Sequence, residues 1–132
     1  MKILFINTYD TMGGAAIAAP RLNKGLEKHF ATENYALVGQ KESDDPAVFG
    51  TRAHRIESVG SMKTAIEILL DAVFNKLGLQ YQYFPFSSSY ILSKAKSLNP
   101  DIISLHNTHG GYFKTALLRK LSKMAPVFWT LH

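Results

Sequence analysis

Apolar and polar positions divide this chain into two alternating kinds of segment. Short runs of apolar and β-branched residues, each bounded by polar residues, glycine or proline, predict buried strands; these runs are residues 2–7, 35–38, 101–105 and 126–131. The stretches between them carry apolar residues three and four positions apart, which is typical of amphipathic helices that pack on a sheet. Strands that alternate with helices favour a mostly parallel sheet covered on both faces, in a doubly wound α/β fold. We expect residues 1–132 to form a single domain of this class.

The first helix is expected to begin at residues 16–18 and to end near His29. Pro20 sets that start, because a proline is tolerated in the first turn of a helix, where its missing amide is not needed. The apolar side chains expected to face the sheet are Ile17, Leu22, Leu26 and Phe30. After the strand at 35–38, the polar residues 40–50 predict a surface loop.

The middle of the chain contains one clear helix pattern and one ambiguous stretch. Residues 61–77 carry apolar side chains at helical spacing, and Gly78 is a typical helix stop. Residues 51–58 are ambiguous, and a short strand at 53–56 is one interpretation. An aromatic cluster follows and is expected to lie in the core or at an interface; its members are Tyr81, Tyr83, Phe84 and Phe86.

The last third of the chain predicts two helices around a strand. Residues 87–89 are three serines, which are expected to cap a helix that ends near Leu98. A basic amphipathic helix that ends near Met124 is expected between the strands at 101–105 and 126–131.

Composition is that of a soluble globular protein. Hydrophobic residues make up 46% of the chain and charged residues 19%, which excludes an intrinsically disordered segment. The chain has no cysteine, so disulfides, thiolate metal sites and a cysteine nucleophile are excluded. Its apolar opening is too short for a signal peptide, and no stretch approaches the roughly 18 apolar residues of a membrane span. We expect a cytoplasmic location.

The formal net charge of +5 is unevenly distributed. After Ala72 the only acidic residue is Asp101, while the basic residues there are Lys76, Lys94, Lys96, Lys114, Arg119, Lys120 and Lys123. Such asymmetry favours an anionic partner, such as a phosphorylated ligand or an acidic surface touched peripherally at the inner face of the membrane. Lysines on solvated helix faces are the alternative. Nucleic acid is not expected, because no recognition motif is present and the basic residues are not interleaved with aromatic ones.

Two distinctive loops follow the first strand and the strand at 101–105. The first contains Gly13 and Gly14 before a run of small residues, and the second, residues 106–111, reads HNTHGG. Both are expected at the carboxyl ends of parallel strands, where doubly wound folds bind ligands. For the glycine pair two interpretations stay open: a bare backbone that approaches an anion at a helix N-terminus, or a tight turn that needs glycine. The motifs G-x-G-x-x-G, G-x-x-x-x-G-K-[ST] and G-x-S-x-G are absent, which argues against ordinary dinucleotide, P-loop and α/β-hydrolase sites.

Three histidines near these strand ends are candidates for chemistry. His106 and His109, with His132 at a neighbouring strand end, have a spacing that could ligate a metal. No carboxylate lies near them in sequence, however, and no metal is expected. His106 is expected to hydrogen-bond the backbone and shape the loop. His109 lies beside the two glycines of the loop, where its imidazole can hydrogen-bond a sugar hydroxyl or a phosphate oxygen, so we expect function there.

Four segments, taken together, resemble a known family. In chain order they are Met1-Lys2-Ile3-Leu4-Phe5-Ile6-Asn7, Gly13-Gly14-Ala15-Ala16, Pro100-Asp101-Ile102-Ile103-Ser104-Leu105-His106-Asn107-Thr108-His109-Gly110 and Pro126-Val127-Phe128-Trp129-Thr130-Leu131-His132. The chain resembles the N-terminal half of retaining GT-B glycosyltransferases of the glycogen-synthase-like, group 1 superfamily (family 4). Within it, the chain is most similar to bacterial members that build surface and capsular polysaccharides. The resemblance covers nearly the whole chain apart from residues 40–89, and it implies a Rossmann-like fold.

The resemblance also implies roles for the matching positions. Gly13 and Gly14 would approach the donor phosphate or the acceptor. His109 would contact the transferred sugar near the reaction centre, and His132 would line the acceptor side. The expected substrate-binding residues are Gly13, Gly14, His106, Asn107 and His132. The implied substrates are a nucleotide sugar and a glycan or lipid-linked acceptor, with no cofactor.

The chain departs from the family pattern in three ways. Pro20 is unusual in the first helix, and the motif that begins with Thr130-Leu131-His132 stops there. The C-terminal Rossmann-like domain, which carries most nucleotide-sugar contacts in the family, is absent. The resemblance therefore implies a catalytically incomplete chain, either truncated or a separately encoded half. An alternative from another class is a free-standing flavodoxin-like α/β module that binds a small phosphorylated ligand or a protein partner.

Overall fold

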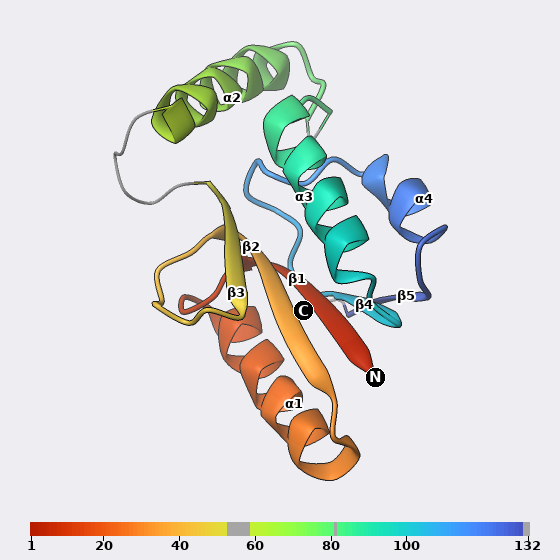
Figure 1. Ribbon diagram of the computed structural model, residues 1–132. Helices are drawn as coiled ribbons and strands as arrows, with labels where there is room; N and C mark the ends of the chain where they lie inside the picture. The colour runs from red at the N-terminus through yellow and green to blue at the C-terminus, as the bar shows by residue number, and fades with distance from the viewer. Residues whose placement is uncertain (53–58, 81, 131–132) are drawn as a thin grey trace.

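The computed structural model describes residues 1–52, 59–80 and 82–130 of the chain (Figure 1). Its strands form one sheet in which every neighbouring pair is parallel. In chain order the elements are β1 (Lys2–Tyr9), α1 (Gly14–Phe30), β2 (Glu33–Gln40), β3 (Val48–Arg52), α2 (Val59–Lys76), α3 (Pro85–Leu98), β4 (Ile102–Leu105), α4 (Leu117–Leu121) and β5 (Val127–Trp129).

The strand order β3-β2-β1-β4-β5 places β1 at the centre of the sheet. Within β1, Ile6 pairs with Leu37 of β2 on one side and with Leu105 of β4 on the other. The chain moves outward from β1 through β2 to β3 and then returns to place β4 beside β1, so the order reverses between β1 and β4. This is the Rossmann order, whereas a flavodoxin-like sheet follows the order 2-1-3-4-5. The predicted doubly wound, Rossmann-like class is confirmed, and the flavodoxin-like topology of the alternative is wrong.

Successive side chains of β1 point to opposite faces of the sheet. Leu4 is fully buried in a core that also contains Ile91 of α3 and Leu121 of α4. Phe5 points to the opposite face, where it lines a cavity together with Ala16 of α1. Helices α3 and α4 therefore cover one face of the sheet and α1 covers the other (Figure 1).

Helix α1 differs from the prediction at its start and on its buried face. It begins at Gly14 instead of at residues 16–18, so Pro20 lies inside the helix and has no amide hydrogen to offer the Ala16 carbonyl. The side chains that α1 buries are those of Ala16 and Ala19. Those expected to face the sheet are exposed, with the exception of the half-buried Leu26; the exposed ones are Ile17, Leu22 and Phe30.

Helix geometry explains this correction. Ile17 and Leu22 are five positions apart, which separates them by about 140° around a helix, so they do not share one face. Ala16 and Ala19 are three positions apart and do share one. Their small side chains let the helix backbone lie close to the sheet.

Helix α2 closely matches the prediction, and Gly78 follows it with a positive φ of 75°. Its outward side is largely apolar and open to solvent, because α2 contacts only α3 and β3 extensively. Exposed fractions of 40% to 66% are found for Met62, Ile66, Ile68, Leu69 and Val73. The apolar side chains of this helix were expected to pack on the sheet, and this expectation is wrong for most of them.

Helix α3 begins two residues before the serines that were expected to cap it. Pro85 is its first residue, a position that suits proline because the first amide of a helix has no intrahelical partner. The first turn is capped from outside: the Glu67 carboxylate of α2 accepts the Ser87 amide at 2.8 Å and the Ser87 hydroxyl at 2.5 Å. Glu67 is 2% exposed, so this contact joins two helices in the interior.

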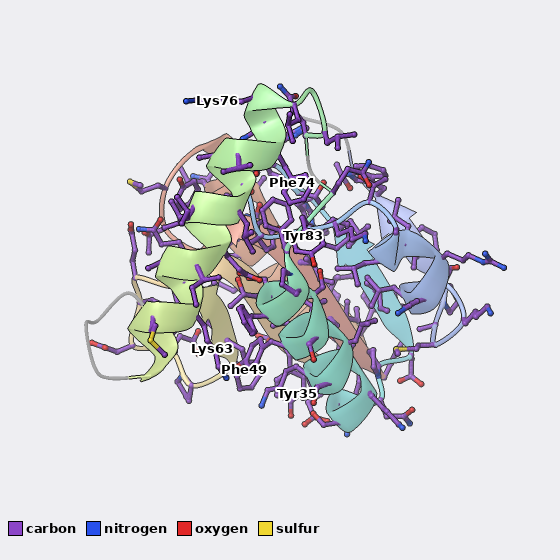
Figure 2. All side chains as sticks on the ribbon, turned by 90° about the horizontal axis from the view of Figure 1, so that it is seen from above. Tyr35, Phe49, Lys63, Phe74, Lys76 and Tyr83 are labelled. Atoms are coloured by element: carbon purple, nitrogen blue, oxygen red, sulfur yellow. The ribbon has the colours of Figure 1, made fainter. Side chains whose placement is uncertain are left out.

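The aromatic cluster divides between interior and surface. Phe84 is buried, as expected for a core member, while Tyr83 and Phe86 are exposed. The Tyr83 ring stacks on Phe74 of α2 with ring centres 4.9 Å apart (Figure 2). Tyr81 lies outside the described residues.

Three further expectations met different outcomes. The predicted surface loop at 40–50 is too long, because residues 48–50 already belong to β3. The basic helix is shorter than predicted, with α4 confined to Leu117–Leu121. The strand suggested for 53–56 lies outside the described residues.

Candidate functional site

Two loops meet where β1 and β4 end, at the point where the strand order reverses. The Thr8 hydroxyl of β1 lies 2.9 Å from the Asn107 carbonyl oxygen and 2.5 Å from that of His109. A hydroxyl has one hydrogen to donate, so it either shares that hydrogen between the two carbonyls or donates it to one of them. In both cases Thr8 fixes the second loop against the end of β1.

Asn7 joins the end of β1 to the second loop through its side chain. Its Oδ1 accepts the amide of Thr8 at 2.9 Å and the amide of Asn107 at 3.2 Å, while its Nδ2 donates to the Tyr9 carbonyl at 2.9 Å. Asn7 is 5% exposed, so its polar atoms are satisfied inside the protein and the cost of burying them is offset.

Tyr112 supports the second loop from the interior of the protein. It is fully buried, and its hydroxyl donates to the Asn107 carbonyl at 3.1 Å. Burial raises the pKa of the Tyr112 hydroxyl well above its ordinary value, against a smaller opposite effect of a hydrogen bond with Thr8. The ring also occupies the space beside Gly39, where an added Cβ would lie 2.8 Å from Tyr112 Cδ1. Tyr112 is therefore a neutral structural support.

Glycines occupy the turns of both loops for different reasons. Gly13 is the N-cap residue of α1 and has a φ of 87°, and its carbonyl accepts the Ile17 amide at 3.2 Å. Gly14 is the first residue of the helix; both glycines are exposed with open space where a Cβ would be. Gly110 has a φ of 104°, and its added Cβ would lie 2.7 Å from Thr8 Cγ2. The first loop thus leaves its backbone bare to solvent, and the second uses glycine to approach β1.

The two loop histidines have different environments. His106 is 4% exposed; its ring stacks on Phe5 with centres 5.7 Å apart, and its Nε2 lies 3.2 Å from the Ser104 hydroxyl. Its carbonyl accepts the Trp129 indole N–H at 3.3 Å. These contacts enclose the ring of His106 between Phe5 and Ser104.

His109 is exposed near the outer end of the same loop. Its amide donates to Asn107 Oδ1 at 3.1 Å, and its carbonyl lies beside the Thr8 hydroxyl. The Asn107 side chain forms an Asx turn that holds the backbone of His109 in place. An exposed imidazole on a fixed backbone is suited to contact a ligand.

Asp10 extends the site toward β2 and was not recognised in the sequence. Its two carboxylate oxygens accept the amides of Glu42 and Ser43, each at 2.9 Å. Partial burial opposes ionisation, but the hydrogen bonds from Ser43 and Glu42 outweigh it, so the pKa of Asp10 lies below the ordinary value of 3.8. The Thr11 hydroxyl also donates to the Glu42 carboxylate. The loop before α1 is therefore anchored to the loop after β2.

A cavity of about 250 Å³ opens between α1 and the sheet beside these loops. Asn7, Asp10 and Ala16 contribute to its wall, together with the half-buried Asn23. The cavity, the bare backbone of Gly13 and the exposed His109 thus all belong to the region around the carboxyl end of β1, although His109 does not line the cavity.

Metal binding has no support in the part of the chain that the structure describes. Within it, no three His, Asp or Glu side chains gather as a metal site requires. His132, the suggested third ligand and acceptor-side residue, lies outside that part. No helix among the described residues is long and apolar enough to cross a membrane.

Comparison of the chain with models of protein families, with curated proteins and with solved structures finds no match in any of the three. The class of protein is therefore defined by its fold: a Rossmann-like α/β domain with a candidate ligand site at the strand-order reversal.

Proposed function

We propose that this chain is the acceptor-side domain of a sugar-nucleotide-dependent glycosyltransferase that acts in the synthesis of a bacterial polysaccharide. The observation that carries the proposal is the contact between the end of β1, which leads into the glycine loop, and the loop of His109 at the end of β4. In doubly wound folds ligands bind in the crevice at this place. The resemblance of these segments to the glycosyltransferase family is the reason for proposing a nucleotide sugar and a glycan or lipid-linked acceptor as the ligands.

In this proposal each loop has a separate task. The exposed backbone at Gly13 and Gly14 approaches the donor phosphate or the acceptor without side-chain obstruction. His109 hydrogen-bonds the transferred sugar. Asn107 positions His109, because its amide, its carbonyl and its Oδ1 all have partners within the protein.

Positive charge near the leaving group is the remaining requirement. Sugar transfer from a nucleotide donor releases a phosphate anion, and preorganised positive groups or amide donors stabilise it as it forms. Gly13 and Gly14 lie at the N-terminus of α1, which carries a partial positive charge. The proposal assigns the main cationic contacts to a second α/β domain, as in the family that the sequence resembles.

Sugar transfer by the natural protein, together with the second α/β domain that the proposal requires, tests the proposal. The purified protein is incubated with a panel of radiolabelled UDP-, GDP- and dTDP-sugars and with membrane extract as the acceptor source, and labelled glycan is measured. We expect transfer from one donor of the panel. If a folded protein transfers sugar from none of them but binds a phosphorylated ligand or a protein partner, the proposal is overturned in favour of a binding module.

A further inference from the structure

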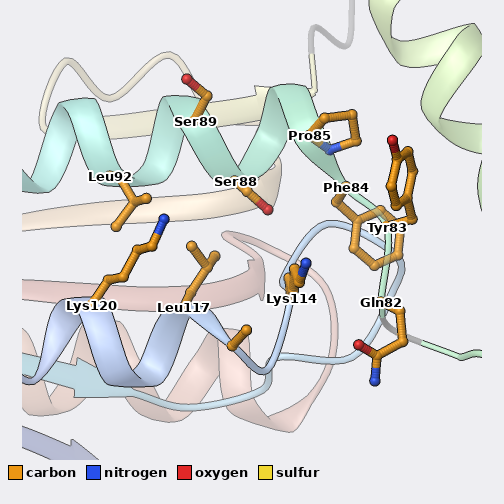
Figure 3. Close-up of a pocket in the computed structure, with 11 residues that line it drawn as sticks. Gln82, Tyr83, Phe84, Pro85, Ser88, Ser89, Leu92, Lys114, Leu117 and Lys120 are labelled. Carbon is orange, nitrogen blue, oxygen red and sulfur yellow. The ribbon is translucent and has the colours of Figure 1, made fainter.

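A second cavity, of about 440 Å³, lies between the start of α3 and α4, separate from the crevice at β1 and β4 (Figure 3). Its wall combines two lysines, two serines and a row of apolar side chains. The residues that matter for its chemistry are Tyr83, Pro85, Ser88, Leu92, Lys114 and Lys120.

Both charged residues of the wall are cations. Lys114 is half-buried and Lys120 is exposed, and among the described residues no acidic side chain lines the cavity. The ion pair found among the described residues joins Lys2 to Glu33, so neither cavity lysine has a carboxylate partner there. Glu67, the carboxylate near the start of α3, is engaged with Ser87 and lines a different cavity, toward α2 and β3. The cavity is therefore positively charged.

Ser88 adds an unsatisfied hydroxyl to the two lysines. Its Oγ is buried and has no hydrogen-bond partner in the described structure. A buried hydroxyl without a partner is destabilising, so a ligand oxygen at this position would satisfy it. Figure 3 shows the Ser88 hydroxyl and the amine groups of Lys114 and Lys120 directed into the space between the two helices.

The rest of the wall is apolar. Phe84 and Leu117 are almost fully buried beneath it, and the apolar surface still open to water belongs to the exposed Tyr83 and Pro85 and the half-buried Leu92. A simple inorganic anion would leave this wall without a partner, whereas a ligand with an anionic head and a hydrocarbon body would cover it and remove apolar surface from water.

From this arrangement we infer that the cavity between α3 and α4 binds an amphiphilic phosphate, with the phosphate at Ser88, Lys114 and Lys120 and the hydrocarbon against Tyr83, Pro85 and Leu92. A phosphate head presents three strong acceptor oxygens to the three donor groups, while a carboxylate presents two. This chemistry is shared by the headgroup of a phospholipid and by an isoprenoid phosphate. The inference does not depend on glycosyl transfer in the crevice.

Calorimetric titration of the natural protein with farnesyl phosphate tests the inference. Three reference compounds separate the parts of the ligand: inorganic phosphate, farnesol and laurate. We expect farnesyl phosphate to bind at least about tenfold more tightly than each of them, as the loss of one charge-assisted hydrogen bond or of the apolar contact predicts. Laurate that binds as tightly as farnesyl phosphate would overturn the assignment of a phosphate.

Two variants locate the binding. The double substitution Lys114→Gln and Lys120→Gln is expected to weaken binding of farnesyl phosphate at least about tenfold, and Ser88→Ala severalfold. Lys123→Gln is the matched control, because Lys123 is exposed and does not line the cavity. Thermal unfolding checks that each variant is folded. Equal weakening by the control, or none by the double substitution in a folded protein, would contradict the site.

Vesicles distinguish the two sources of the phosphate. Co-sedimentation is measured with phosphatidylcholine vesicles that do or do not contain phosphatidic acid. Binding to the phosphatidate vesicles that the double substitution abolishes supports the site and assigns a phospholipid. Binding of farnesyl phosphate without binding to these vesicles supports the site and assigns an isoprenoid phosphate. If the protein binds neither farnesyl phosphate nor the phosphatidate vesicles, the inference is overturned. The proposed sugar transfer is tested by its own assay and does not depend on that result.

Discussion

At Gly110 the backbone has a φ of 104° and the position of a Cβ would be 2.7 Å from Thr8 Cγ2. Gly110→Ala must therefore strain the backbone and displace Thr8, whose hydroxyl holds the loop of His109. We expect Gly110→Ala to lower the free energy of unfolding by about 1 to 3 kcal/mol, measured by urea denaturation.

Gly25→Ala is the matched control for this prediction. Gly25 lies within α1 with open space around its Cβ position, so alanine there is expected to stabilise the helix by about 0.5 to 1 kcal/mol. A Gly110→Ala protein as stable as the wild type would contradict the close contact between the loop and Thr8.

The lowered pKa of Asp10 predicts that this residue contributes to stability in a pH-dependent way. Because the hydrogen bonds of the folded state hold its pKa below the ordinary value of 3.8, Asp10 stabilises the fold above that pH and loses the contribution as the pH falls through its folded-state pKa. The difference in free energy of unfolding between the wild type and Asp10→Asn is therefore expected to shrink from about pH 6 to about pH 3. Asp44→Asn, an exposed change nearby, should show no such trend; a constant Asp10→Asn difference would contradict the prediction.

Residue types alone indicated part of the site. The loop of residues 106–111 and the glycine pair could be singled out because each follows an apolar run that predicts a parallel strand, and doubly wound folds bind ligands at such strand ends. The roles of Asn7 and Thr8 could not be predicted, since their partners lie about a hundred positions away in the sequence. Tyr112 escaped notice although its partner Asn107 is near it in the sequence, because an aromatic residue in a sequence does not show which carbonyl its hydroxyl reaches.

At the scale of elements, the contact between Glu67 and Ser87 joins α2 to α3. Glu67→Ala removes the acceptor of a buried amide and of a buried hydroxyl, which is expected to cost about 1.5 to 3 kcal/mol of unfolding free energy. A double-mutant cycle with Ser87→Ala should give a coupling energy of about 0.5 kcal/mol or more.

Ser97→Ala provides the control for this cycle. Its hydroxyl donates to the Lys94 carbonyl on the exposed part of α3, so its loss is expected to change stability by less than about 0.5 kcal/mol. Additive effects of Glu67→Ala and Ser87→Ala would contradict the hydrogen bond between the Ser87 hydroxyl and the Glu67 carboxylate.

The predicted helix starts and buried faces were wrong where contacts between elements, and not local sequence signals, determine them. Three serines looked like a helix cap in sequence, yet Pro85 starts the helix and Glu67 of another helix supplies the cap. In α1 the bulky apolar residues suggested the buried face, while Ala16 and Ala19 form it. Small residues carry little hydrophobic signal even where close packing selects them.

For the whole molecule, the core lies between the sheet and the pair α3 and α4, and α2 adds little to it. Ile91 of α3 is fully buried, whereas Leu69 of α2 is 66% exposed. Ile91→Ala is therefore expected to lower the free energy of unfolding by about 2 to 5 kcal/mol, and Leu69→Ala by less than about 0.5 kcal/mol. Similar costs for the two changes in denaturant unfolding would contradict this division.

The parallel sheet could be predicted because strand and helix patterns alternate along the whole chain, and a parallel neighbour requires a crossover. The order of its strands depends on which edges pair, and hydrophobic periodicity does not encode that. The structure supplies it: by placing β4 beside β1, it brings the glycine loop and the loop of His109 to the same edge of the sheet.

The central claim, that sugar is transferred at this edge of the sheet, is tested most directly at His109. In the natural protein, His109→Ala is expected to lower kcat of sugar transfer about 100-fold or more, the scale of losing one preorganised hydrogen-bond donor, with thermal unfolding unchanged. His29→Ala, an exposed histidine near the end of α1, should leave kcat unchanged. A folded His109→Ala protein that transfers sugar at the wild-type rate would contradict the account.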